Sequence, residues 1–381
     1  MKSIIQEAIA KHQESKALEE RQVGSPAPAH NAPMSADDEE LSKLAEQLKV
    51  NIRIVGCGGG GSNTINRCVE EGISGAEMCA INTDAKHLLT IHAPRKVLIG
   101  RRATKGLGAG ARPEVGEEAA RENEEDLRNF LQGAHIVFVT AGMGGGTGTG
   151  SAHVVGRIAK ELGALTMGVT TLPFSAEGAV RMESARDGLE RLRRVCDTTI
   201  VIQNDKLLEL VPRMPLDAAF KLADAVLMTA IKGITEIVTK PGLVNLDYAD
   251  LLTIMKDGGV ALIGLGESES ATDRVTEAVT EALTSPLLGD VDLKDATGAL
   301  VRVVGGPSMT VSEAEKAAAL VGSKISKRAR IIWGCTIDPS TEMENTIKVL
   351  LIITGVKAAS LLGSRGGYAQ GETSGGIDQV S

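Results

Sequence analysis

The chain has 381 residues, a formal net charge of −8 and few aromatic residues, namely one Trp, two Tyr and four Phe. Its length provides enough core for two domains, whereas the negative charge and the scarce base-stacking surface argue against nucleic acid as the main partner. No apolar run approaches the roughly 18 residues of a membrane span, and the five Cys form no C-x-x-C pair, which favours free thiols in a reducing compartment. We therefore expect a cytoplasmic protein with no direct membrane span.

The first 50 residues are expected to form an extension ahead of the core. Residues 1–20 predict a short helix with an apolar face, residues 24–35 a tether rich in Pro and Ala, and residues 37–49 an acidic helix. At the other end, residues 363–381 are rich in Gly, Ser and Gln, and we expect them to be disordered.

Between these ends, predicted strands and helices alternate, which is typical of a parallel sheet covered by helices on both faces, the α/β fold class. We expect a first domain at residues 51–215, a long joining helix at residues 216–242 that stops at Lys240-Pro241-Gly242, and a smaller α/β domain at residues 243–362. The second domain is predicted to have strands near residues 260–265, 298–304, 330–337 and 346–354, and helices near residues 273–283 and 312–329. In the first domain, the cluster Arg191, Arg193 and Arg194 is interpreted as a solvated helix face.

Residues 144–150 read Gly-Gly-Gly-Thr-Gly-Thr-Gly, between a predicted strand at residues 136–140 and a helix expected to begin near Ser151. Glycine can adopt positive φ and approach an anion closely, so successive N–H groups and the positive end of the helix point at one place. Because no Lys follows, the segment is not a Walker A loop. The pattern predicts a loop that holds a phosphate chain. The alternative, a flexible linker, rarely lies between an apolar strand and an amphipathic helix.

A second glycine run, residues 56–63, follows a predicted buried strand at residues 51–55 and leads into a helix. Read as Gly-x-Gly-x-x-Gly, it matches the dinucleotide fingerprint, and Asp84 follows the next strand at about the distance of a ribose-binding acid. An NAD(P)-dependent oxidoreductase is therefore one alternative. It leaves the other phosphate-type loop unexplained, and the six His are scattered without an evident catalytic partner.

Three groups of side chains suit a nucleoside, although each also has a structural interpretation. Glu177 and Arg181 lie four apart on one helix face, as in an ordinary ion pair. Phe220 and Asp224 are also four apart, which places an aromatic face beside a carboxylate, as a purine requires; a core Phe with a solvent-facing Asp is the commoner meaning. Asn204 follows a predicted strand and either faces a base or ribose or forms an Asx turn.

Asp247 and Asp250 are three apart at the start of a predicted helix and project to the same side, where they could orient a water by accepting its hydrogens. A bound triphosphate repels carboxylates unless Mg²⁺ and directed N–H groups intervene. A site that needs carboxylates only during the reaction can receive them from another subunit. The alternative is that the helix dipole favours acids at this N-terminus.

These motifs together resemble the tubulin-type GTPases, and most closely the FtsZ family of prokaryotic tubulin homologues. The resemblance rests on five loops in the same order, at residues 56–63, 82–84, 105–110, 144–150 and 245–250, and covers about residues 52–363. Three features look most like archaeal members of the family: the residue sequence of the last loop, the N-terminal extension and residues 305–307. The second archaeal paralogue is one option.

The resemblance implies a Rossmann-type GTP-binding domain, a central helix and a smaller C-terminal domain, in subunits that stack head to tail into filaments of the cell-division ring at mid-cell. It implies that Asp247 and Asp250, assisted by Asn245, enter the nucleotide pocket of the next subunit and position the attacking water. The implied cofactors are GTP and GDP with Mg²⁺. The implied partners are further copies of the chain and a membrane-tethering division protein.

The resemblance also implies a set of residues that contact the nucleotide, from the phosphates to the guanine. These are Gly59, Gly60, Gly61, Ser62, Asn63, Ala109, Gly110, Gly145, Gly146, Thr147, Gly148, Glu177, Arg181, Asn204, Phe220 and Asp224. In this assignment the loop around Ala109 and Gly110 senses the γ-phosphate, Phe220 stacks on the guanine and Asp224 binds its N1/N2 edge.

The sequence departs from the family pattern at several places. Ser62 stands where Gly is frequent, and Arg112 stands where Asn is usual, which places a cation near the γ-phosphate loop. The tail lacks the terminal peptide by which bacterial members bind membrane tethers, so residues 1–16 are a candidate docking element. A filament of the same family specialised for cell shape or scaffolding is the second alternative function.

Overall fold

The computed structural model describes residues 49–211, 215–240, 244, 246–270, 272–289, 291–339, 343 and 345–356. The expected helices and tether of residues 1–48, the catalytic candidate Asn245 and the expected disordered tail lie outside the described residues.

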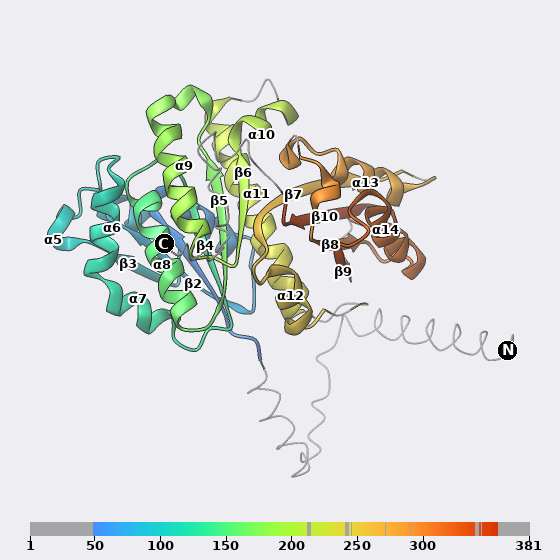
Figure 1. The fold of residues 1–381 in the computed structure, drawn as a ribbon, viewed down its shortest axis with the longest axis horizontal. Helices are drawn as coiled ribbons and strands as arrows, with labels where there is room; N and C mark the ends of the chain where they lie inside the picture. Colours follow the sequence, from blue (N-terminus) through green and yellow to red (C-terminus); the bar gives the residue numbers. More distant parts are fainter. Residues whose placement is uncertain are drawn as a thin grey trace, which may run out of the picture. The chain divides into compact units, whose positions relative to one another are not determined.

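Ten strands of the described chain form one mixed sheet in the order β3-β2-β1-β4-β5-β6-β7-β10-β8-β9 (Figure 1). The strands are β1 (Ile52–Cys57), β2 (Ala76–Asn82), β3 (Arg95–Leu98), β4 (Ile136–Gly142), β5 (Leu165–Leu172), β6 (Thr198–Gln203), β7 (Gly259–Ser268), β8 (Gly298–Gly305), β9 (Arg330–Ile337) and β10 (Ile347–Thr354). The predicted parallel sheet is confirmed for β1 to β6. β7 continues it in parallel, whereas β10 runs antiparallel to β7 and β8.

Helices cover both faces of this sheet, as the alternating pattern predicted (Figure 1). They are α3 (Gly58–Glu70), α4 (Ala85–Thr90), α5 (Arg101–Thr104), α6 (Pro113–Glu122), α7 (Glu124–Leu131), α8 (Thr147–Glu161), α9 (Ala179–Arg193), α10 (Asn204–Leu210), α11 (Leu216–Thr239), α12 (Tyr248–Met255), α13 (Arg274–Leu283) and α14 (Val311–Lys324). Short 3₁₀ turns lie at Ser175–Glu177, Pro286–Leu288 and Leu293–Asp295.

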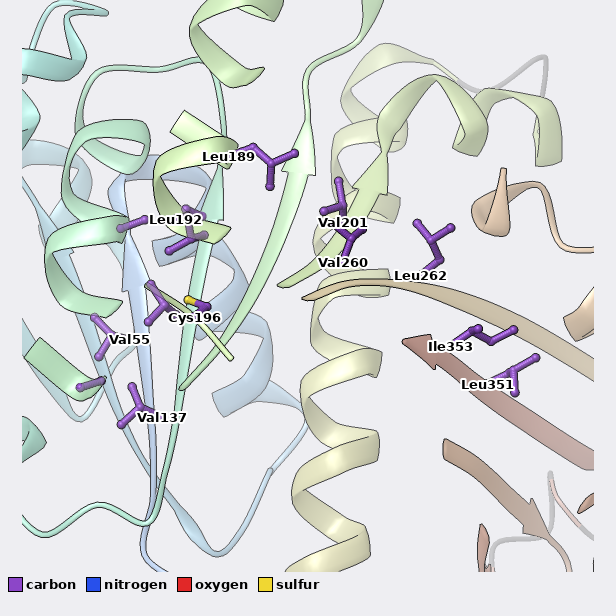
Figure 2. Close-up of a cluster of buried hydrophobic side chains, with 14 of the residues drawn as sticks. Val55, Val137, Leu189, Leu192, Cys196, Val201, Val260, Leu262, Leu351 and Ile353 are labelled. Atoms are coloured by element: carbon purple, nitrogen blue, oxygen red, sulfur yellow. The ribbon is translucent and has the colours of Figure 1, made fainter. Parts of the chain in front are cut away.

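One face of the sheet carries an apolar cluster that continues from the first α/β unit into the second. Figure 2 shows Val55 and Val137 near Leu192 of α9, and Leu262 near Ile353 further along the sheet. The opposite face is covered by α3, α10 and α11, whose inward residues form a separate buried cluster. Since β6 pairs with β7 and one apolar layer runs beneath both, the two expected domains share a continuous sheet.

Two predicted helix boundaries are wrong. α8 begins at Thr147 rather than near Ser151, because the glycine loop already closes helical turns, with Gly150 N–H donating to Gly146 O at 3.0 Å. α14 ends at Lys324, since Ile325 leaves the helix with extended backbone and buries its side chain. α11 begins at the predicted Leu216 and ends at Thr239, with Lys240, the first residue of the predicted stop, as its C-cap.

The arginine cluster of α9 does not form a simple solvated face. Arg191 pairs with Glu117 of α6, and Glu117 also pairs with Arg121 at 2.8 Å. Although burial opposes ionisation, the hydrogen bonds from these two arginines lower the pKa of Glu117 to about 2. The network ties α6 to α9.

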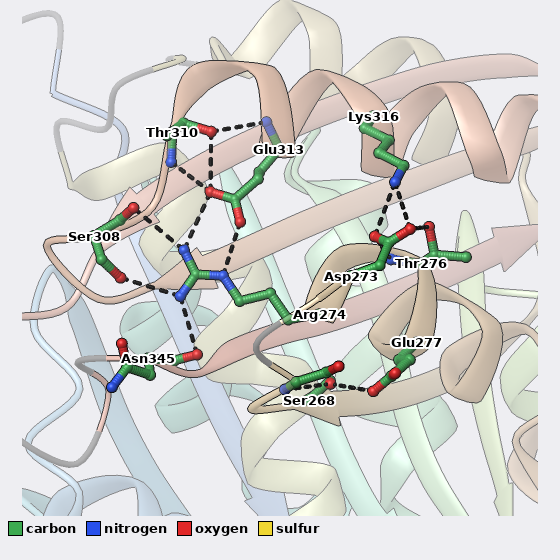
Figure 3. A network of polar contacts seen from close by, with 11 residues as sticks. Ser268, Asp273, Arg274, Thr276, Glu277, Ser308, Thr310, Glu313, Lys316 and Asn345 are labelled. Atoms are coloured by element: carbon green, nitrogen blue, oxygen red, sulfur yellow. Dashed lines mark hydrogen bonds and ion pairs between the residues drawn. The ribbon is translucent and has the colours of Figure 1, made fainter.

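Arg274 at the start of α13 is the centre of a second polar network (Figure 3). Its guanidinium donates to the Glu313 carboxylate at 2.8 and 3.1 Å, to Ser308 and to the backbone carbonyl of Asn345. Glu313 also forms the capping box of α14 with Thr310. One nearly buried arginine thereby joins the starts of two helices to the segment before β10.

The five Cys are free and buried. Burial raises the pKa of Cys57 to about 12, so this thiol stays protonated and unreactive at neutral pH. In the part of the chain that the structure describes, no helix combines the length and the apolar character needed to cross a bilayer.

Candidate nucleotide site

The two glycine-rich loops meet at the carboxyl ends of β1 and β4. A Cβ on Gly58 would lie 2.6 Å from the backbone nitrogen of Gly148, so the loops contact each other through their backbones. A Cβ on Gly61 would lie 2.3 Å from Thr140 O. Glycine is required at these positions because no larger residue fits between the two backbones.

Other glycines of the same loops are not required by packing. No heavy atom lies within 4 Å of a Cβ built on Gly59 or Gly145, and neither residue has positive φ. These glycines face open space beside the start of α8. A glycine that the fold does not need, at a helix N-terminus, fits an anion that approaches the backbone N–H groups closely.

Threonine hydroxyls hold the phosphate loop in this form. Thr147 Oγ1 lies 2.6 Å from Thr83 Oγ1 at the end of β2, and Thr149 Oγ1 accepts a hydrogen bond from Gly144 N–H at 2.8 Å. Sequence reasoning missed Thr83 and Thr149 as supporting residues. These two threonines could have been found from the sequence, because both lie in loops that were already predicted to bind the nucleotide.

The loop of residues 105–110 lies beside the phosphate loop. Gly108 N–H donates to Thr83 O at 3.1 Å, and Ala85 N–H donates to Gly106 O at 3.0 Å, which fixes the loop to the end of β2. A Cβ on Gly146 would lie 2.8 Å from the Ala109 side chain. The structure therefore brings Ala109 next to the phosphate loop, and Gly110 follows it with an exposed backbone at a φ of 58°.

Two of the expected phosphate contacts are placed differently. Ser62 is fully buried, and its hydroxyl has no hydrogen-bond partner among the described residues. Its side chain therefore packs inside the fold and does not line the site. Gly61 is equally buried against Thr140, whereas Gly60 is partly exposed and Asn63 is exposed on α3.

Glu177 and Arg181 form the ion pair that their spacing allowed, at 2.9 Å. The pair is more than a surface contact, because Glu177 also accepts from Phe174 N–H at 2.8 Å and Arg181 lies against the phosphate loop. A Cβ on Gly144 would lie 2.8 Å from Arg181 Cγ. The pair thus connects the turn after β5 to the phosphate loop.

Phe220 is 39% exposed on α11, so its interpretation as a core residue is wrong. The buried ring of Phe174 meets it edge to face, with ring centroids 5.1 Å apart and an interplanar angle of 86°. This contact fixes the ring of Phe220 while leaving a face available for stacking. The supporting role of Phe174 was not predicted from the sequence.

Asp224 lies one turn further along α11. Its side chain does not face solvent, so the alternative interpretation, which required a solvent-facing Asp, is wrong. Burial raises its pKa to about 7, and the positive charge of Arg67 opposes the rise. Asn204, at the start of α10, is 4% exposed, and its side-chain oxygen is buried without a partner among the described residues. A nucleoside with N–H and O–H donors would satisfy both groups.

Asp247 and Asp250 begin α12, and their side chains form a capping box. Asp250 N–H donates to Asp247 Oδ1 at 2.7 Å, and Asp250 Oδ2 faces the N–H of Asp247 at 3.4 Å. Asp247 therefore caps the helix, which agrees with the alternative interpretation that acids are favoured at this N-terminus. Both residues are nevertheless exposed, so their remaining carboxylate oxygens can reach a partner.

The position of α12 separates these acids from the glycine loops. Tyr248 of α12 donates through its hydroxyl to His135 O, just before β4, at 3.1 Å, and Thr198 at the start of β6 donates to Met255 O. α12 therefore packs at the amino ends of β4 and β6, whereas the phosphate loop follows the carboxyl end of β4 (Figure 1). One strand length, roughly 20 Å, lies between them.

This arrangement defines a nucleotide-binding protein of the doubly wound α/β class, with phosphate loops at the carboxyl ends of the strands and two exposed acids at the amino ends. Residues 51–212 match the family model described as Tubulin/FtsZ family, GTPase domain, and residues 259–357 match that described as FtsZ family, C-terminal domain. The chain is 54% identical over 366 residues to cell division protein FtsZ 1 of Archaeoglobus fulgidus, with 96% of each chain covered. It is 53% identical over 325 residues to FtsZ 1 of Methanocaldococcus jannaschii, with 85% of this chain and 88% of that protein covered.

Solved structures agree with these matches. The structure titled "FtsZ dimer, empty (M. jannaschii)" has a TM-score of 0.80 at 53% identity and covers 84% of this chain and 93% of that one. The GTPγS-bound protofilament of CetZ2 from Haloferax volcanii has a TM-score of 0.71 at 21% identity, with 82% of this chain and 96% of that one covered, which shows a likeness of fold alone.

The chain belongs to the FtsZ family of cell division proteins. It is a tubulin-type GTPase that binds GTP and GDP. The oxidoreductase alternative is wrong, and Asp84, its expected ribose ligand, instead caps α4 by accepting from His87 N–H at 3.1 Å. The relatives from Archaeoglobus and Methanocaldococcus both carry the name FtsZ 1, so they give no support to the second paralogue.

Proposed function

We propose that this protein polymerises head to tail and that Asp247 and Asp250 of one subunit complete GTP hydrolysis on the nucleotide of the next. The observation that carries the proposal is the separation of these acids from the phosphate loop by the length of β4 within one subunit. Acids at that distance cannot touch a phosphate held by their own chain. Stacking subunits along the strand direction would bring the two edges together.

In this proposal the triphosphate lies over the start of α8, with Gly145 and Gly59 leaving room for it. Backbone N–H groups of the phosphate loop bind its oxygens, and Ala109 and Gly110 lie at its terminal phosphate. Phe220 stacks on the guanine, and ionised Asp224 accepts from the guanine N–H groups. Glu177, Arg181 and Asn204 bind the ribose and base region.

Mg²⁺ fits this site as a companion of the nucleotide. Mg²⁺ prefers phosphate oxygens and water, and no group of three or more His, Cys, Asp or Glu in the described residues could hold it alone. The hydroxyl of Thr147, which lies 2.6 Å from the Thr83 hydroxyl, is the proposed protein ligand of the ion. When bound, the ion neutralises charge on the phosphates.

We further propose that the filaments act in the cytoplasm, at the division site in mid-cell, and that a tethering protein of unknown identity links them to the membrane. Residues 1–16 are the proposed docking element. In this scheme residues 51–215 bind the nucleotide together with Phe220 and Asp224 of residues 216–242, which connect the domains. Residues 243–362 carry the acids.

Asp250→Ala tests hydrolysis across the subunit contact. We expect GTP-dependent light scattering to persist while phosphate release falls at least about 100-fold, because the water loses an acceptor. Asp250 is preferred to Asp247, because the main capping bond at 2.7 Å uses the Asp250 backbone and survives the substitution. Glu125→Ala, which removes an exposed carboxylate from α7, is the matched control.

Normal phosphate release by assembled Asp250→Ala would exclude the assigned role. Mixing Asp250→Ala with Gly145→Ala, which keeps its own acids, distinguishes hydrolysis by acids of the same subunit from hydrolysis by acids of the neighbouring subunit. Recovery of turnover in the mixed filaments requires action in trans, and no recovery in mixed filaments of both chains contradicts it.

A further inference from the structure

Arg112 lies against the phosphate loop. A Cβ on Gly146 would be 2.9 Å from Arg112 N and 3.1 Å from Arg112 O, so the two backbones are in contact. Arg112 N–H donates to Ala109 O at 3.2 Å, which closes the turn that carries Ala109 and Gly110. An arginine side chain that starts at this point can reach a phosphate held over the loop.

The fold does not explain an arginine at this position. Arg112 is the N-cap of α6, where Asn, Asp and Ser are preferred, and a cation there is disfavoured by the positive end of the helix dipole. Its side chain makes no capping bond. It is exposed and forms no ion pair with any described residue. The positive charge therefore has a local cost and no structural partner among the described residues.

Three other arginines close to the phosphate loop or to Arg112 are already engaged. Arg181 pairs with Glu177, Arg191 with Glu117, and Arg194 with Glu190. The loop itself contains no Lys. Phosphoryl transfer nevertheless depends on positive charge aimed at the oxygens where negative charge develops.

We propose that Arg112 contacts the terminal phosphate of GTP bound in its own subunit and stabilises the charge that develops on it during hydrolysis. The proposal rests on the placement of the triphosphate over the start of α8. The water oxygen bonds to the γ-phosphorus while the bond from that phosphorus to the bridging oxygen breaks. GDP leaves with the bridging oxygen and its electron pair, and the protons of the water go to the released inorganic phosphate and to solvent. Arg112 donates hydrogen bonds throughout and transfers no proton.

The competing role is electrostatic and structural. Arg112 lines an open pocket between α6 and α9 together with four acidic residues and two other arginines, namely Glu114, Glu183, Asp187, Glu190, Arg191 and Arg194. If its charge served to balance these acids, its removal would lower the stability of the protein and affect all nucleotides equally.

Arg112→Asn separates the two roles, because Asn is a good N-cap and removes the charge. GTPγS and GDP are titrated at protein concentrations too low for assembly, and unfolding is followed without nucleotide. We expect affinity for GTPγS to fall about tenfold, affinity for GDP to change less than about twofold, and stability to be kept or raised. Phosphate release per assembled subunit should fall at least about tenfold. Arg112→Lys should restore part of each loss.

Arg186→Ala on α9 removes another exposed arginine and should change none of these values. An unchanged ratio of GTPγS affinity to GDP affinity in Arg112→Asn, or a lower stability of this variant, would overturn the role of Arg112. Failure of the unaltered protein to bind either nucleotide would instead overturn the placement on which the proposal rests.

Discussion

At the scale of single residues, Asp224 shows how burial prepares a side chain for a ligand. A carboxylate that is buried without a strong partner holds its proton to higher pH, and burial raises the pKa of Asp224 to about 7. A raised folded-state pKa makes the ionised form costly, so the stability penalty is absent below the unfolded pKa near 4 and grows up to about pH 7. Guanine N–H groups would repay that cost.

We expect affinity for GDP to fall about tenfold per pH unit as the pH drops below 7, because only the ionised carboxylate accepts from both guanine N–H groups. Equilibrium titrations from pH 5.5 to 8.5 measure this. Asp224→Asn should bind weakly and with no such slope. Without nucleotide, it should gain stability relative to the unaltered protein as the pH rises from 5 to 8. A flat profile in the unaltered protein would contradict the role of Asp224.

At the scale of elements, α6 and α8 cross at glycines. A Cβ on Gly150 would lie 2.0 Å from Pro113 O, and one on Gly116 would lie 2.3 Å from Gly146 O. The crossing therefore holds the phosphate loop, the start of α6 and the loop of residues 105–110 in one backbone-to-backbone contact. The same sequence run contains Gly145, which has no such contact.

Substitution by alanine should affect stability and GDP binding differently at these two kinds of glycine. Gly150→Ala should lower the free energy of unfolding by about 1–3 kcal/mol, because a Cβ has no space between the helices. Gly145→Ala should keep or slightly raise stability while weakening GDP binding, since its Cβ occupies space left for the phosphates. Denaturant unfolding without nucleotide and GDP titration distinguish them. Unchanged GDP affinity in Gly145→Ala would place the phosphates elsewhere.

At the scale of the whole molecule, a buried ion pair links α11 to the second unit. Arg302 of β8 pairs with Glu236 of α11, and both side chains are nearly buried, at 12% and 6% exposure. Glu236 also pairs with Lys240 at 2.7 Å. Burial lowers the pKa of Arg302, and the charge of Glu236 opposes the shift. The pair reinforces the continuity of the sheet through β6 and β7.

Arg302→Met should destabilise the protein by about 3 kcal/mol, because Glu236 loses a buried partner. The double variant Arg302→Met with Glu236→Leu should recover most of the loss, because no unpaired charge remains in the core. Lys348→Ala breaks the exposed pair with Glu267 and should cost less than about 1 kcal/mol. Additive losses in the double variant, measured by denaturant unfolding, would show that the two side chains do not act as a pair.

Most of the architecture follows from local pattern. Strand and helix order, the long central helix and the two phosphate-type loops were predicted, because apolar periodicity, Gly runs and Pro-Gly stops act over a few residues. Boundaries were less accurate, as at Thr147 and Lys324, because hydrogen bonds in the glycine loop and burial of Ile325 decided them.

The sequence by itself determined the fold class, the family and the identity of the loops, since these depend on residue type and order along the chain. Only the tertiary structure decided which residues face the site. It buried Ser62, exposed Phe220 and set Phe174 behind it, and it left Asn204 without a partner among the described residues. It also placed Asp247 and Asp250 at the far edge of the sheet, because the packing of α12 against β4 and β6 joins segments that are distant in sequence.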